Sequence, residues 1–142
     1  MADKAQEYVQ NIPFDTAALP AEPDVVAPDG LEIRQLPAPR NNSASVAHCT
    51  LPAGQISKAV RHRTVEEVWF FLSGRGELWR AVEDLEENLS VHPGMSVTIP
   101  IGTSFQLRSV GNEALVFILI TTPPWPGDEE AVRVTDYWAP TS

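Results

Sequence analysis

His62 and Glu67 are the two residues of this sequence whose types and spacing most favour chemistry. The imidazole of a histidine exchanges a proton near neutral pH, and a nearby carboxylate orients the ring and favours its charged form. Such a pair can act as general acid and general base, for example in moving a proton next to a carbonyl group. The same side chains are ligands for divalent transition metals. A third interpretation is purely structural, because burying either residue without a partner is costly and pairing avoids that cost.

The pair lies in the first of two stretches that are punctuated by glycine and proline. Residues 54–74 begin and end with glycine and contain His62 and Glu67. Residues 94–109 begin with glycine, carry Pro-Ile-Gly at positions 100–102 and place Phe105 three residues later. In both residue types and intervals the two stretches resemble the two sequence motifs of the cupin family. The resemblance covers about residues 44–122.

The resemblance implies a metal site in which two of four ligand positions have been lost. In metal-bearing cupins three histidines and one glutamate meet at the metal, at the positions of Val60, His62, Glu67 and Phe105 in this sequence. Only His62 and Glu67 keep ligand side chains here, and catalytic metal sites commonly use three protein ligands. We therefore expect no resident metal cofactor, and at most weak binding of a divalent transition metal. His48, on a candidate strand of the same barrel, is a conceivable replacement ligand, whereas His92 precedes a turn and is expected to point to solvent.

The order of apolar runs and turn signals predicts an all-β fold. Short strands at regular spacing with Gly and Pro between them are typical of a sandwich or a barrel. The candidate strands span residues 31–36, 45–51, 58–62, 67–72, 76–81, 88–91, 96–99, 104–108 and 114–121. Together with the resemblance, this predicts a double-stranded β-helix, or jelly-roll barrel, over residues 31–122. Residues 1–30 are expected to form an extended, proline-rich N-terminal arm, and residues 123–142 a short C-terminal extension that packs on the barrel.

Alternation along the strands predicts which side chains share the barrel interior with His62 and Glu67. Successive side chains of a strand point to opposite faces, so residues two apart share a face. Gln106 is expected to point outward. A lining that is mostly apolar and aromatic with a few polar groups is typical of a small-molecule site. The predicted pocket-lining residues are Val60, Trp69, Phe71, Phe105 and Leu107.

Two candidate strands have no polar face. Residues 68–72 and 115–120 are apolar at every position, so both faces of each strand are expected to be buried. One face lines the barrel, and the other needs a cover from the N-terminal arm or from another subunit. Because cyclic dimers are the commonest closed assembly, we expect a homodimer.

Composition argues against several classes of partner. Nineteen acidic and ten basic residues give a net charge of −9, which disfavours nucleic acids and anionic membranes as partners. The longest apolar run, residues 114–120, is far shorter than the roughly 20 residues that cross a bilayer. No secretory signal opens the sequence, and Cys49 is the only cysteine, so we expect a cytoplasmic protein.

Two functions follow from these observations, and the sequence alone does not decide whether the protein is an enzyme. The first is a cupin-type small-molecule enzyme of the isomerase, epimerase or cyclase kind, which uses His62 and Glu67 for acid–base chemistry in a barrel-interior pocket. The alternative is a non-catalytic small-molecule binding cupin in which the metal site is vestigial. Fold alone does not choose between them.

Overall fold

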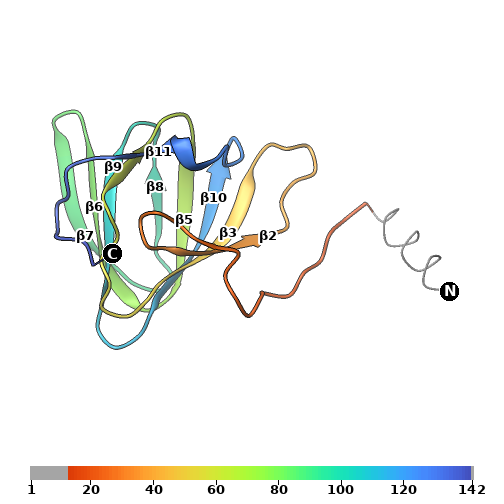
Figure 1. The fold of residues 1–142 in the computed structure, drawn as a ribbon, viewed down its shortest axis with the longest axis horizontal. Coiled ribbons are helices and arrows are strands. Elements are labelled where there is room, and N and C mark those ends of the chain that lie inside the picture. Colours follow the sequence, from red (N-terminus) through yellow and green to blue (C-terminus); the bar gives the residue numbers. More distant parts are fainter. Residues whose placement is uncertain (1–12, 142) are drawn as a thin grey trace.

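The computed structural model describes residues 13–141, and its regular secondary structure is almost entirely antiparallel β-strand (Figure 1). The elements are β1 (Val25–Val26), β2 (Glu32–Leu36), β3 (Ser45–Leu51), β4 (Val60–His62), β5 (Glu66–Ser73), β6 (Arg75–Val82), β7 (Leu85–Val91), β8 (Ser96–Ile99), β9 (Ser104–Val110), β10 (Leu115–Thr122), the 3₁₀ turn η1 (Asp128–Glu130) and β11 (Ala131–Arg133). The predicted all-β jelly-roll fold is confirmed.

The strands form two sheets that face each other across one core. The larger sheet has the order β1-β2-β3-β10-β5-β8, and the smaller has the order β11-β4-β9-β6-β7. Alternation decides which side chains enter the core, as on β5, where Glu67, Trp69 and Phe71 are buried and the residues between them are exposed. The core therefore consists of the inner faces of both sheets.

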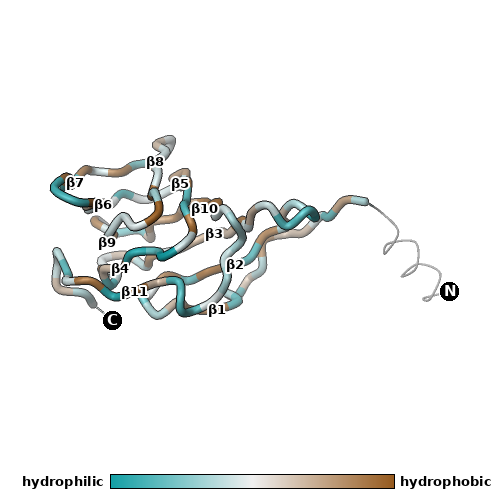
Figure 2. The backbone as a smooth tube through the Cα atoms, turned by 90° about the horizontal axis from the view of Figure 1, so that it is seen from above, coloured by the Kyte–Doolittle hydropathy of each residue, from teal (hydrophilic) through white to brown (hydrophobic). Residues whose placement is uncertain are grey.

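The two sheets approach each other along two open edges. β7 and β8 end the sheets on one side of the barrel, and β1, β2 and β11 lie on the other side (Figure 2). Side chains and loops must close both edges, because within residues 13–141 no strand of one sheet pairs with a strand of the other.

The segments on either side of the barrel each contribute a short strand to it. Residues 1–12 lie outside the described part of the chain. Val25 and Val26 form β1, which pairs with β2, so the expected arm contributes a strand to the larger sheet. At the other end of the chain, residues 131–133 form β11, which pairs with β4. Within residues 13–141 no helix is long and apolar enough to cross a membrane.

The outer face of β5 is exposed and so is the neighbouring Ile120 of β10, whereas Val116 and Ile118 of β10 are half-buried. This corrects the expectation that both faces of these strands are buried. Val68, Phe70, Leu72 and Ile120 are between 41% and 46% exposed, and no described segment of the chain covers them. Pairing places Val68 beside Ile120 on adjacent strands, so these side chains form one apolar surface. We call these four residues the outer apolar face.

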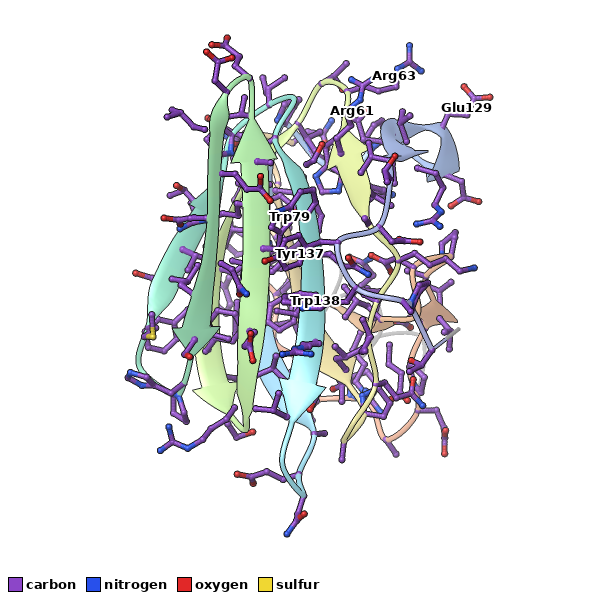
Figure 3. All side chains as sticks on the ribbon, turned by 90° about the vertical axis from the view of Figure 1, so that its left-hand side faces the viewer. Arg61, Arg63, Trp79, Glu129, Tyr137 and Trp138 are labelled. Atoms are coloured by element: carbon purple, nitrogen blue, oxygen red, sulfur yellow. The ribbon has the colours of Figure 1, made fainter. Side chains whose placement is uncertain are left out.

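The outer face of the smaller sheet is covered by the C-terminal segment. Trp79 of β6 stacks on Tyr137, with ring centroids 5.4 Å apart, and Trp138 follows along the same sheet (Figure 3). Gln106 points outward as expected, yet it is fully buried beneath this segment. Its amide donates to the carbonyl oxygens of Ser57 and Trp138, and its oxygen accepts from the backbone N–H groups of Tyr137 and Trp138.

Candidate functional site

His62 and Glu67 lie close together at one end of the barrel, on opposite sheets. His62 ends β4 in the smaller sheet, and Glu67 lies near the start of β5 in the larger sheet. The short connection between the two strands turns the chain from one sheet to the other. His62 Nδ1 is 3.7 Å from Glu67 Oε1, and both side chains are almost completely buried.

Two neighbouring side chains hold the Glu67 carboxyl group. Trp69 Nε1 donates to Oε1 at 3.0 Å, and Thr121 Oγ1 donates to Oε2 at 2.8 Å. Thr121 is the direct cross-strand partner of Glu67, so the register of β5 against β10 creates the second contact. Burial nevertheless raises the pKa of Glu67 to about 7, although both hydrogen bonds favour the ionised form.

Aromatic rings surround His62. The centroid of Phe105 lies 5.1 Å from the imidazole and that of Trp125 lies 5.0 Å from it, both edge to face. Burial lowers the pKa of His62 to about 4, even though the negative charge of Glu130 opposes this shift. His62 Nδ1 makes no hydrogen bond to any of residues 13–141.

The pair is therefore neutral near pH 6 and is not an ion pair. The 3.7 Å separation alone would suit a salt bridge. Burial, however, shifts both pKa values toward the uncharged forms, so His62 has lost its proton where Glu67 still carries one. The site consequently contains a neutral imidazole beside a carboxylic acid that gives up its proton near neutral pH.

The C-terminal segment covers this end of the barrel and supplies residues that sequence reasoning missed. Trp125 lies against His62, and its backbone N–H donates to Ser45 Oγ at 3.1 Å. Glu130 accepts hydrogen bonds from the Val65 backbone at 2.9 Å and from Thr64. Although burial opposes it, these bonds hold the pKa of Glu130 below its usual value. We call residues 123–130 the C-terminal strap.

The predicted pocket-lining residues lie on the inner faces, and their rings pack against one another. Trp69 stacks on Phe117 with centroids 4.7 Å apart and meets Phe105 edge to face at 5.3 Å. Val60, Phe71 and Leu107 are buried in the same core.

Two hollows of the described chain lie away from these rings. One of about 370 Å³ lies between the edges of β7 and β8, and one of about 310 Å³ lies beside the strap. The lining role of the five residues stays a prediction.

The structure does not bring His48 to the site. Cys49, the next residue of β3, is fully buried on the inner face, so His48 points to the outer face of the larger sheet. There it lies beside Arg34 and Ile118 on the neighbouring strands.

The inward position of Thr121 could have been predicted from the sequence, because Thr121 shares a strand face with Phe117 on β10. No local sequence pattern indicated a role for Trp125 or Glu130.

Comparison with known proteins assigns the family. The family described as Cupin domain matches residues 47–121, which is more than half of the chain. The chain belongs to the cupin family. An uncharacterized protein of Methanocaldococcus jannaschii is 27% identical over 110 residues, which are 75% of this chain and 85% of that protein.

Solved cupin structures share the fold at low identity. Pac13 of Streptomyces, described as a nucleoside dehydratase, has a TM-score of 0.64 at 13% identity over 84% of this chain and 92% of that one. The cupin domain of Schizosaccharomyces pombe Cnp3 has a TM-score of 0.57 at 15% identity. That match covers 65% of this chain, which spans 64% of the length of the yeast chain.

The residues at this site do not fit the metal that the cupin family implies. Val60 and Phe105, which stand at two ligand positions, are buried and offer no donor atoms. Both Glu67 oxygens already accept hydrogen bonds from Trp69 and Thr121. Among residues 13–141, no three His, Cys, Asp or Glu side chains are grouped so that they could hold a metal ion. The chemistry of this site must be derived from its side chains.

Proposed function

We propose that this cupin acts on a small carbonyl-bearing molecule by proton transfer through His62 and Glu67. The observation that carries the proposal is the buried, neutral pair, in which burial raises the pKa of the acid to about 7 and lowers that of the imidazole to about 4. An acid whose pKa lies near the working pH can both give and take a proton, and such shifts cluster at functional sites.

The two side chains have complementary roles in this proposal. Glu67, held by Trp69 and Thr121, gives its proton to the substrate or recovers one from it. His62, whose Nδ1 has no partner among the described residues, accepts a proton or a hydrogen bond from the substrate. Proton shifts next to a carbonyl group, as in an isomerase or epimerase, need this combination. The likeness to Pac13, described as a nucleoside dehydratase, shows that this fold can serve a small-molecule enzyme.

Exchange of carbon-bound hydrogen for deuterium tests the proposal without knowledge of the natural substrate. The protein is incubated in D₂O with a panel of aldoses, ketoses and 2-hydroxy ketones, and loss of the C–H signal beside the carbonyl is followed by NMR. We expect exchange above the buffer rate for at least one compound. Glu67→Gln and His62→Gln should each slow it by about a hundred- to ten-thousandfold, the usual contribution of a general acid or base.

Glu66→Gln is the matched control, because it makes the same side-chain substitution at the exposed neighbour of Glu67. Exchange that both Glu67→Gln and Glu66→Gln leave unchanged would overturn the proton-transfer role. If a compound binds but is always recovered without deuterium, the alternative function, a non-catalytic binding module, holds.

We also propose that two copies of the chain pair through the outer apolar face. Four large apolar side chains are exposed together there, and burial of apolar area contributes about 25 cal/mol per Å². A two-fold interface brings the same surface of both copies together, which this exposed sheet face allows. The net charge of −9 fits a small-molecule ligand better than a nucleic-acid partner.

Light scattering at micromolar concentration should therefore give the mass of a dimer. Phe70→Glu should convert it to the monomer mass, because the substitution places a charge in the centre of the proposed interface. Ile101→Glu is the control, since Ile101 is equally exposed but lies in the turn after β8. A monomer mass for the unmodified chain, or a dimer that persists with Phe70→Glu, would contradict the pairing.

A further inference from the structure

The hollow between the edges of β7 and β8 has a charged floor and apolar walls. Its volume is about 370 Å³, within the usual range for a small-molecule site. It lies where β7 and β8, the end strands of the two sheets, do not pair with each other. The lining includes Arg80, Val82, Leu85, Glu87, Pro100 and Thr103.

Arg80 points into the barrel rather than away from it. On β6 it shares the parity of Gly76 and Leu78, and its cross-strand partners are Phe105 on β9 and Glu87 on β7. The guanidinium reaches across the open edge, where Nη1 donates to the carbonyl oxygen of Thr98 on β8 at 2.8 Å. This bond joins the two sheets and fixes the cation in the hollow.

Glu87 pairs with Arg80 but is much less confined. The two side chains form a hydrogen-bonded ion pair in which Arg80 is 21% exposed and Glu87 is 53% exposed. An ion pair with one half-exposed partner is worth little, because water competes for the carboxylate. The cation is therefore a fixed part of the hollow, whereas the Glu87 carboxylate can be exchanged for another one.

The rest of the lining suits the body of an organic molecule. Val82, Leu85 and Pro100 offer apolar walls, and the first two are more than a third exposed. Thr103 adds a buried hydroxyl that has no hydrogen-bond partner among residues 13–141. Rotation about χ1 would exchange its hydroxyl and methyl groups and bring the hydroxyl to a guest.

The hollow also borders the His62 side of the barrel. Gly102 N–H donates to the His62 carbonyl oxygen at 3.1 Å, which places Thr103 beside His62 along the junction of β4 and β9. Phe105, the partner of Arg80 on β9, contacts the imidazole ring. Thr103 and Phe105 therefore form the partition between the hollow and the His62–Glu67 pair.

We propose that this hollow binds a small organic monocarboxylate with an apolar body. The carboxylate takes the place of Glu87 on the Arg80 guanidinium, whose planar fork matches two carboxylate oxygens. The body lies against Val82, Leu85 and Pro100. A phosphate is disfavoured, because Arg80 is the one cation of the lining and Glu86 and Glu87 stand near it. This site does not depend on the proton transfer proposed for His62 and Glu67.

Binding of phenylacetate, compared with 2-phenylacetamide and phenethylamine, tests the charge preference. The three probes share a phenyl body and carry a carboxylate, a neutral amide and an amine. In a titration followed by ¹H–¹⁵N NMR, phenylacetate should shift the amide signals of Arg80, Thr103 and their neighbours, with a Kd in the millimolar range. The amide and the amine should bind at least about tenfold more weakly, since neither can replace a carboxylate on a guanidinium.

Substitutions in the Arg80–Glu87 ion pair test the carboxylate site more directly than the choice of probe does. Arg80→Gln should weaken phenylacetate binding about tenfold or more, whereas Glu87→Gln should strengthen it about three- to tenfold, because the internal competitor is gone. Asp84→Asn and Arg75→Gln are the charge-matched controls on the same hairpin, and neither lines the hollow. Each variant's own NMR spectrum shows whether it is folded.

Three results would overturn the proposal. The first is the absence of shifts at saturating phenylacetate, and the second is binding of the amide or the amine as tight as that of the carboxylate. The third is weaker binding in Glu87→Gln, or a gain in Asp84→Asn equal to that in Glu87→Gln, which would reduce the effect to net charge. Because the titration needs no turnover, failure here leaves the deuterium-exchange test of His62 and Glu67 untouched.

Discussion

Replacing Trp69 with alanine is expected to lower the free energy of unfolding by about 3 to 5 kcal/mol, the range for a large aromatic residue removed from a core. Trp69 is fully buried on β5, stacks on Phe117 and meets Phe105 and Phe71 edge to face. The substitution leaves a cavity between the sheets and removes the N–H group that donates to Glu67. Urea unfolding followed by circular dichroism measures the loss.

Trp125→Ala is the control variant for this prediction. Trp125 is also a tryptophan near the His62–Glu67 pair, but it is 36% exposed and lies outside the core. Trp125→Ala should lower the free energy of unfolding much less than Trp69→Ala does, because a partly exposed side chain buries less apolar area on folding. Equal losses in the two variants, or a loss below about 1 kcal/mol for Trp69→Ala, would mean that the aromatic cluster is not the centre of the core.

The second large effect concerns the pH dependence of stability, in which Glu67 and His62 are expected to act in opposite directions. Burial raises the pKa of Glu67 from 4.5 to about 7, so the folded state keeps a proton that the unfolded state releases. Its contribution to stability is full below pH 4.5 and is lost as the pH rises to about 7. Burial lowers the pKa of His62 from 6.5 to about 4, so its contribution is full above pH 6.5 and is lost as the pH falls to about 4.

Between pH 4.5 and pH 6.5 the Glu67 contribution to the free energy of unfolding falls while the His62 contribution rises, so the two changes nearly cancel. Each shift corresponds to about 3 kcal/mol, since one pKa unit is worth about 1.4 kcal/mol. With His62→Gln, stability should fall as the pH rises through this window, because the Glu67 contribution then acts alone. With Glu67→Gln, stability should rise instead. Unfolding by urea at several pH values across the window measures both slopes.

Glu66→Gln should show the slope of the unmodified protein, because Glu66 is exposed on the outer face of β5. Slopes of the same sign in His62→Gln and Glu67→Gln would contradict the neutral-pair description. They would mean that burial does not shift both pKa values toward the uncharged forms.

The inner face of the barrel could be predicted from the sequence because it depends on local rules. Alternation along one strand fixes that Glu67, Trp69 and Phe71 share a face, and the structure places all three inside. Gly74 is another local signal, since its φ of 82° and its close approach to the Ala114 carbonyl oxygen leave no room for a side chain. The inner face of β5 and the glycine at position 74 could therefore be predicted from motif spacing alone, without knowing which strands pair.

What covers each outer face could not be predicted, because it depends on segments far apart in the chain. Gln106 looked like a solvent-facing residue, but it binds the backbone at Tyr137 and Trp138. The outer face of β5 looked buried, but the arm pairs at the far edge of the same sheet through β1. Glu130 holds Thr64 through contacts between residues 66 apart, and alternation carries no information over such distances.

The pairing of early strands with late ones restricts how the chain can fold while it is being made. β3 pairs with β10, and β4 pairs with β11, so each waits for a partner that is synthesised some 70 residues later. Until residues 131–133 have left the ribosome, β4 has one free edge and the site end of the barrel has no cover. Non-local pairing of this kind is slow because loop closure precedes any gain in contacts. The nascent chain therefore depends on residues 123–133 to close this end of the barrel and to protect the edge of β4 from association with other chains.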